Sequence, residues 1–214
     1  MKQDAVKPLL FIAIPTRGKH SFHFSQDISG TIYPSNFSLV QMYIGYREVG
    51  KARNIACAKA VELGAQYIVF RDEDVIGTPI TLKTLLYHMA NHPDWTFCSA
   101  LYATKSYPPE PLLYTEWGQG ANYEWQLGDL KKVLFTGMGY SIIRVSDLAL
   151  LEPEQYEDGD YNTGNPVRYK EYFKTGDSGE TDGISTFKYG HTEDAHFFKM
   201  LEDKGLHSYI DTSL

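Results

Sequence analysis

Short runs of apolar residues alternate along this chain with segments whose apolar residues recur at helical spacing, and this alternation limits the folds open to it. Largely apolar, strand-like runs occupy residues 9–14, 66–70 and 95–101, and helical spacing occupies residues 47–64 and 81–91. Apolar runs of about four to eight residues are typical of strands that are buried on both faces of a sheet. The order of these segments predicts an α/β fold with a layered, mostly parallel sheet and flanking helices.

Length and composition limit the number of domains and the classes of function that are open to the chain. The chain has 214 residues, of which 43% are hydrophobic, so we expect a single domain over residues 1–214. Its net charge of −7 argues against binding to nucleic acid, which requires a positive surface. The apolar stretch at 9–14 is too short for a signal peptide or a membrane span, so we expect no integral membrane segment. Cys57 and Cys98 lie in apolar patterns without metal-ligand spacing, which predicts a reducing, cytoplasmic setting.

The acidic triplet Asp72-Glu73-Asp74 follows the apolar run at 66–70 after a single arginine. In open α/β sheets, ligands bind beyond the carboxyl ends of the strands, and carboxylate oxygens suit hard divalent cations. A D-x-D triplet is weak support by itself because it arises readily by chance. Its place at the end of a buried strand favours a metal-assisted site over a solvated acidic turn.

Four further motifs lie in or beside predicted elements. They are Pro15-Thr16-Arg17-Gly18 after the first strand, Ala52-Arg53-Asn54 in the helix at 47–64, Thr136-Gly137-Met138-Gly139 between two strands, and Thr192-Glu193-Asp194 at the start of a helix. Each places polar groups or bare backbone where a ligand can reach them. Each also has a structural explanation, since turns favour glycine, helix surfaces carry charges, and acids are favoured in the first turn of a helix.

Two segments lack regular periodicity. Residues 102–129 contain several prolines and a group of tyrosines and tryptophans that includes Trp117. This composition predicts a loop whose rings either pack on one another or offer a surface to a sugar. Residues 154–190 are poor in aliphatic side chains and rich in glycine and acidic residues, which predicts a flexible loop.

Taken in order, these motifs resemble those of glycosyltransferases with the GT-A (Rossmann-like) fold, most closely the family 2-like enzymes, over residues 9–211. The triplet Thr192-Glu193-Asp194 is similar to the TED motif of processive members such as cellulose and chitin synthases. The resemblance implies transfer of a sugar from a nucleotide-diphosphate sugar to a hydroxyl of a saccharide or another acceptor, with inversion of the anomeric centre. It also implies dependence on Mn²⁺ or Mg²⁺.

The same resemblance assigns roles to individual residues. Asp72 and Asp74 would hold the metal, with His191 as a possible further ligand, and Asp194 would be the general base that Glu193 assists. Contacts to the nucleotide and the donor sugar would come from Pro15, Thr16, Arg17, Arg53, Asn54, Asp72, Glu73 and Gly137. Trp117 would stack on the acceptor.

Two other functions compete with this prediction. A haloacid-dehalogenase-like phosphohydrolase also places D-x-D after an apolar strand, although Val75 and Ile76 fit its motif poorly. A non-catalytic module that binds nucleotide-sugars is the third hypothesis. Many family members supply a further metal ligand beyond the strand that follows the TED helix. In this sequence the one candidate for that role is His191, and a lone histidine is more often structural, which motivates this third hypothesis.

Overall fold

The computed structural model describes residues 6–45, 48–159, 166–175 and 192–214. The strands of its central sheet are β1 (Leu9–Thr16), β2 (Ser38–Gly45), β3 (Tyr67–Arg71), β4 (Trp95–Ala100), β6 (Leu130–Val133), β8 (Tyr140–Arg144) and β11 (His207–Asp211). The helices are α1 (Phe22–Gly30), α2 (Val49–Glu62), α3 (Thr81–Asn91), α4 (Glu193–Asp203) and the 3₁₀ helix η1 (Val145–Leu150). Two smaller ribbons pair β5 (Leu113–Tyr114) with β7 (Phe135–Thr136), and β9 (Gln155–Gly159) with β10 (Pro166–Lys170).

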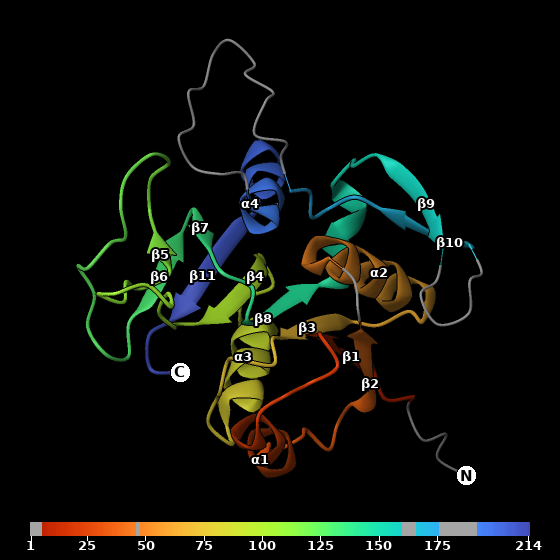
Figure 1. Ribbon diagram of the computed structural model, residues 1–214, viewed down its shortest axis with the longest axis horizontal. Helices are drawn as coiled ribbons and strands as arrows, with labels where there is room; N and C mark the ends of the chain where they lie inside the picture. Colours follow the sequence, from red (N-terminus) through yellow and green to blue (C-terminus); the bar gives the residue numbers. More distant parts are fainter. Residues whose placement is uncertain (1–5, 46–47, 160–165, 176–191) are drawn as a thin grey trace.

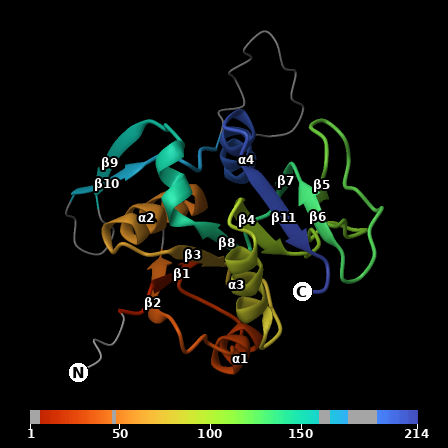
Figure 2. The ribbon, with the colours of Figure 1, turned by 180° about the vertical axis from the view of Figure 1, so that it is seen from behind.

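The central sheet has seven strands in the order β2-β1-β3-β8-β4-β11-β6. Pairing is parallel along β2-β1-β3 and between β4 and β11, whereas β8 and β6 run antiparallel to their neighbours. Helices α2 and α4 cover one face, and α1 and α3 cover the other (Figure 1). The two small ribbons lie beyond opposite ends of this layered body in both views (Figures 1 and 2). The predicted α/β fold with a mostly parallel sheet is confirmed.

Both faces of the sheet are buried, and β1 shows how the sequence achieves this. Phe11 points into the core between the sheet, α2 and α4, whereas Leu10 and Ile12 point into the core that includes α1 and α3. All three are at most 1% exposed. Each such side chain stabilises the fold by about 1.5–3 kcal/mol relative to full exposure. A strand buried on both sides needs a continuous apolar run, which is the pattern that predicted it.

A buried ion pair fixes the carboxyl end of β3. Arg71, which is 1% exposed, pairs with Asp27 of α1 and donates from Nη1 to Thr31 Oγ1 at 2.9 Å. Its guanidinium carbon lies 4.8 Å from the ring centroid of Tyr140. Asp27 also accepts a hydrogen bond from the backbone of Gly77 at 3.1 Å. Arg71 directly precedes the acidic triplet and Gly77 follows it, so the contacts of both residues with Asp27 fix the chain on either side of the triplet.

The prediction of a flexible loop over residues 154–190 needs correction within the described part. Residues Gln155–Gly159 and Pro166–Lys170 form an antiparallel ribbon, and Tyr172 and Phe173 after it are 3% and 2% exposed. The ribbon escaped prediction because aromatic rings, not aliphatic side chains, bury this segment. Residues 160–165 and 176–190 lie outside the described residues. Among the helices that are described, every one is too short or too polar to cross a membrane.

Candidate functional site

Three carboxylates from distant parts of the chain surround one buried guanidinium. Arg53 of α2 is 2% exposed and donates from Nη2 to Asp72 Oδ2 at 2.9 Å. Its Nη1 donates to Glu193 Oε1 at 2.8 Å and to Asp194 Oδ1. Asp72 follows β3, and the other two acids begin α4. The predicted D-x-D and Thr-Glu-Asp motifs therefore lie together, at the carboxyl end of β3.

The charges around Arg53 do not balance. Burial lowers the pKa of Arg53, but Asp194, Asp72 and Glu193 outweigh burial and raise it above its ordinary value, so the guanidinium stays charged. One positive charge faces three carboxylates, which leaves an excess of two negative charges when all three are ionised. Such an excess favours protonation of one acid or the binding of a further cation.

The pKa of Asp194 is raised in this environment. Burial raises the pKa of Asp194 to about 7, with Glu193 and Asp72 adding to the rise and Arg53 and the Met138 backbone amide opposing it. Its side chain is 16% exposed. A carboxylate that titrates near neutral pH is suited to accept a proton from a hydroxyl group.

The D-x-D carboxylates fit a divalent cation. Asp72 Oδ1 is buried and has no hydrogen-bond partner, which leaves an oxygen lone pair for a ligand outside the protein. Asp74 is 52% exposed and forms an ion pair with Lys105. Within the described residues, no group of three or more His, Cys, Asp or Glu side chains forms a metal cluster, and His191 lies outside them. Two carboxylates suffice for a hard cation whose other ligands are water and phosphate oxygens.

The turn after β1 lies against the acidic triplet. Thr16 Oγ1 donates to Glu73 Oε2 at 2.5 Å, and the backbone amide of Arg17 donates to Glu73 Oε1 at 3.2 Å. Gly18 has φ +82°, a conformation that favours glycine, and its amide donates to Thr16 Oγ1 at 3.0 Å. Pro15 is buried and the Arg17 side chain is exposed. The structure therefore brings the predicted nucleotide-binding residues Pro15, Thr16, Arg17 and Glu73 together beside Asp72.

Asn54 has a different environment from the predicted contact with a nucleotide. It is 1% exposed, its Nδ2 donates to the Phe173 carbonyl at 2.9 Å, and its Oδ1 accepts from the Phe173 amide at 2.9 Å. The Phe173 ring stacks on Phe197 with 4.8 Å between centroids and lies 5.9 Å from the Arg53 guanidinium carbon. Asn54 thus holds the segment that forms one wall around Arg53.

The space beside Gly137 is likewise filled by the protein. A Cβ on Gly137 would lie 2.2 Å from Tyr102 Oη, and one on Gly139 would lie 2.8 Å from the same atom. The Gly139 amide donates to Tyr102 Oη at 2.5 Å, and the Gly139 carbonyl accepts from the Asp72 amide at 2.7 Å. These glycines make room for Tyr102, a correction to the predicted contact of Gly137 with the sugar.

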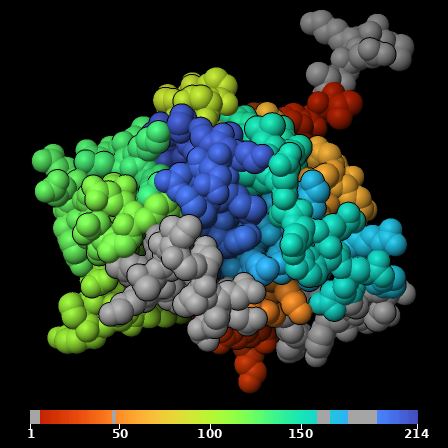
Figure 3. Space-filling model, turned by 90° about the horizontal axis from the view of Figure 1, so that it is seen from above, coloured from red at the N-terminus to blue at the C-terminus, as the bar shows by residue number. Residues whose placement is uncertain are grey.

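Trp117 does not join the carboxylates. Its Nε1 donates to Glu202 Oε2 at 2.8 Å, and its ring stacks on Phe135 with 5.9 Å between centroids. Glu202 lies eight residues after Asp194 on α4, which is about 12 Å along a helix. Helix α4 lies between the segment that contains Trp117 and the β9–β10 ribbon when the molecule is seen from above (Figure 3). The predicted acceptor contact at Trp117 is therefore not part of this cluster.

Sequence patterns missed three residues that the structure places at the site: Tyr102, Lys105 and Phe173. Tyr102 and Lys105 belong to the proline-rich loop, where no periodicity marks them. Phe173 follows Tyr172 in a segment poor in aliphatic residues, and that aromatic pair was the one available indication of burial.

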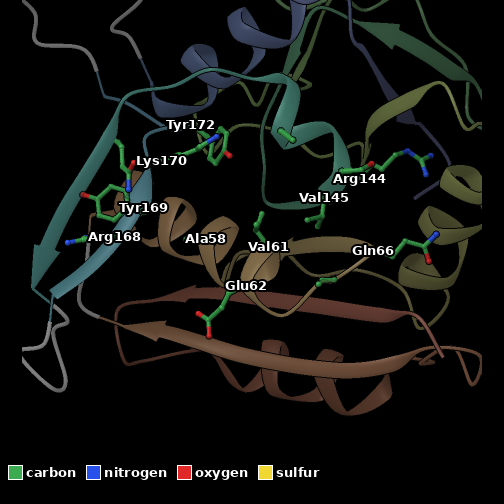
Figure 4. A pocket seen from close by; sticks show the side chains of 15 residues that line it. Ala58, Val61, Glu62, Gln66, Arg144, Val145, Arg168, Tyr169, Lys170 and Tyr172 are labelled. Carbon is green, nitrogen blue, oxygen red and sulfur yellow. The ribbon is translucent and has the colours of Figure 1, made fainter. Parts of the chain in front are cut away.

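A cavity of about 680 Å³ lies away from the carboxylates. It is lined by Val61, Gln66, Arg144 and Lys170 among others, between α2, η1 and the β9–β10 ribbon (Figure 4). Gln66 precedes β3, whereas Asp72 follows it, so the cavity and the carboxylates are at opposite ends of this strand. The candidate site is the carboxylate cluster and not this cavity.

Comparison with solved structures identifies the fold. No protein-family profile and no curated protein matches the sequence. A solved structure of A197 from STIV is similar with a TM-score of 0.57 and 15% identity, over 96% of this chain and 82% of that one. S. aureus TarS is similar with a TM-score of 0.50 and 12% identity, over 96% of this chain but only 35% of the TarS chain. At such identities the likeness shows the fold alone, and that fold is the GT-A-like arrangement that the motifs predicted.

Proposed function

We propose that the chain is a metal-dependent glycosyltransferase that moves a sugar from a nucleotide-diphosphate sugar to an acceptor hydroxyl with inversion. The observation that carries this proposal is the cluster around Arg53, which joins Asp72 of the D-x-D triplet to Asp194. TarS, which shares the fold, has been solved in complex with UDP-GlcNAc, and this supports a nucleotide-sugar as the donor.

The donor would lie beyond the carboxyl ends of β1 and β3. Asp72, through its unpartnered Oδ1, and Asp74 would hold Mn²⁺ or Mg²⁺. The cation would neutralise the negative charge that develops on the departing diphosphate. The turn that contains Thr16 and Arg17, which Glu73 holds in place, would contact the base and the ribose.

Asp194 would act as the general base. Its carboxylate takes the proton of the acceptor hydroxyl, and the hydroxyl oxygen forms a bond to the anomeric carbon. The bond from that carbon to the diphosphate oxygen breaks, and its electron pair leaves with the diphosphate. Attack opposite the leaving group inverts the anomeric centre. Glu193 and Arg53 hold Asp194 in place through their shared ion pair.

Two variants with a matched control test this function. Asp74→Asn should remove Mn²⁺-dependent binding of nucleoside diphosphates, measured by thermal shift across UDP, CDP, GDP and ADP. Saturating ligand at about 100 times its Kd stabilises a protein by about 2.7 kcal/mol, which is a measurable rise in Tm. Asp194→Asn should keep this binding but lose turnover of the donor sugar. Asp203→Asn, at the exposed far end of α4, is the control and should change neither.

The competing functions give different outcomes. Binding of nucleoside diphosphate that needs no divalent cation would contradict metal dependence. Release of phosphate from simple monoesters would instead support a phosphohydrolase. Mn²⁺-dependent binding without donor turnover, with every acceptor class supplied, would leave a binding module. Full turnover in Asp194→Asn would dismiss Asp194 as the base.

A further inference from the structure

Lys105 forms an ion pair with Asp74, the outer carboxylate of the D-x-D triplet. The lysine side chain is 78% exposed and the aspartate side chain 52% exposed. Ion pairs between exposed groups are weak, because water and salt screen them and both side chains lose freedom. The ammonium group can therefore leave Asp74 when a stronger cation arrives.

The loop that carries Lys105 is itself held in place. The Thr104 amide donates to the Glu110 carbonyl at 2.8 Å, and the Glu110 amide donates to Thr104 Oγ1 at 3.0 Å. At the base of the loop, Tyr102 Oη accepts from Gly139, whose carbonyl accepts from the Asp72 amide. The backbone at Lys105 is thus kept near the triplet, while its long side chain can swing.

A divalent cation bound at Asp74 repels the ammonium group on the same carboxylate, because like charges repel, and this weakens the ion pair with Lys105. The displaced ammonium would remain beside the cation, on a stem that the loop holds at the triplet. The diphosphate of the donor would bring negative charge to the same place. Lysine suits this exchange, since it carries a compact positive charge and three donors on a flexible chain. Arg53 is unsuited to this exchange, because it is buried and its Nη1 and Nη2 groups already contact three carboxylates.

We infer that Lys105 is a phosphate-binding residue of the donor site, which contacts Asp74 in the free protein and the diphosphate in the loaded one. This inference rests on the proposed function, since it requires a cation and a diphosphate at the triplet. It predicts effects of opposite sign on the two ligands. Loss of Lys105 removes a competitor of the cation but also removes a partner of the diphosphate.

Calorimetric titration of Lys105→Met measures both effects without any turnover. Affinity for Mn²⁺ alone should rise about two- to fivefold, the range expected when a competing surface ion pair is lost. Affinity for inorganic pyrophosphate at saturating Mn²⁺ should fall about tenfold, as expected for the loss of one charge-assisted hydrogen bond. Pyrophosphate is the probe because it carries the diphosphate without requiring the identity of the base.

Two control variants help to separate the possible outcomes. Lys131→Met removes another partly exposed lysine that pairs with an aspartate, Asp129 at 3.3 Å, and should change neither affinity. Lys105→Arg keeps the charge and should retain most of the pyrophosphate affinity. Unchanged pyrophosphate affinity in Lys105→Met, with binding still lost in Asp74→Asn, would overturn the role of Lys105 and leave the proposed function intact. Failure of the wild-type protein to bind Mn²⁺ and pyrophosphate at the triplet would overturn both.

Discussion

At the scale of single residues, Asp194 shows how position decides chemistry. An aspartate in water ionises near pH 4. Here burial raises its pKa to about 7, and the carboxylates of Glu193 and Asp72 contribute, although Arg53 lies in contact. The acids in the first turn of α4 thus do more than complement the helix dipole, since both contact Arg53.

This shift predicts a pH dependence with a definite sign. The pKa of Asp194 is higher in the folded than in the unfolded chain, so its contribution to stability is complete below about pH 4 and is lost as the pH rises through about 7. Asp194→Asn, which resembles the protonated acid, should therefore be more stable than the wild type at pH 8, by at least about 1 kcal/mol. Donor turnover by the wild type should fall as the pH drops below about 7.

Urea denaturation at pH 4, 6 and 8 measures the first effect. The difference between Asp194→Asn and the wild type should shrink toward pH 4, whereas Asp203→Asn should show no such trend. A difference that stays constant with pH would mean that Asp194 titrates as it does in water.

At the scale of elements, the contact between α2 and the segment after β10 holds that segment in place as one wall of the site. Asn54 uses both ends of its amide to bind the backbone of Phe173, and Thr175 Oγ1 donates to Glu48 Oε1 at 2.8 Å. Gly50 permits this approach, because a Cβ there would lie 3.0 Å from the Phe173 carbonyl oxygen. Glu48, Gly50 and Asn54 thus all lie against the short segment that contains Phe173 and Thr175.

Asn54→Ala should release that segment. The change leaves the amide and carbonyl of Phe173 without their partners in a buried place, which costs about 1–3 kcal/mol for each unsatisfied group. Hydrogen exchange at residues 171–175 should accelerate, and the free energy of unfolding should fall. Asn122→Ala, whose amide donates to Thr115 on an exposed loop, is the control and should change stability little. Unchanged protection of the Phe173 amide would show that Asn54 does not hold it.

Helices and strands differ in how well their own sequence predicts them. The helix predicted at 81–91 is α3, with the same limits, because its apolar residues recur on one face and every turn contributes to the pattern. The β9–β10 ribbon was not predictable in this way. It is stabilised by backbone pairing and by aromatic residues that follow it, and neither produces a local alternation in the sequence.

At the scale of the whole molecule, Arg53 connects parts that are far apart in the chain. It lies on α2, 19 residues before Asp72 and 141 residues before Asp194. A guanidinium group suits this position because its planar array of donors can contact several carboxylates at once. The same contact that assembles the site therefore also joins α2 and the end of β3 to α4.

Arg53→Met should destabilise the whole fold. Removing one partner of a buried ion pair costs about 3–5 kcal/mol, because the remaining charges lose their compensation. The loss should be larger at pH 8 than at pH 5, where Asp194 is protonated, and saturating Mn²⁺ should recover part of it. Urea denaturation with and without Mn²⁺ provides the measurement. Arg168→Met, which breaks an exposed pair with Glu157, should change stability little. An equally small change in Arg53→Met would contradict this account.

Local sequence patterns were enough to predict the class of fold and the places where polar motifs interrupt it. Apolar runs, helical spacing and the acidic triplet are local patterns, and a strand or a helix forms wherever such a pattern has the right period. These patterns placed Asp72 at the end of a buried strand and Asp194 at the start of a helix before any contact was known.

The contacts of those residues depend instead on how distant elements pack together. The tertiary structure surrounded Arg53 with three carboxylates, filled the space beside Gly137 with Tyr102, turned Asn54 toward Phe173, and set Trp117 apart from the cluster. The physical reason is that these contacts join residues on different elements. They depend on the order in which the strands enter the sheet and on which face each helix covers, and no pattern within a short stretch of sequence records that.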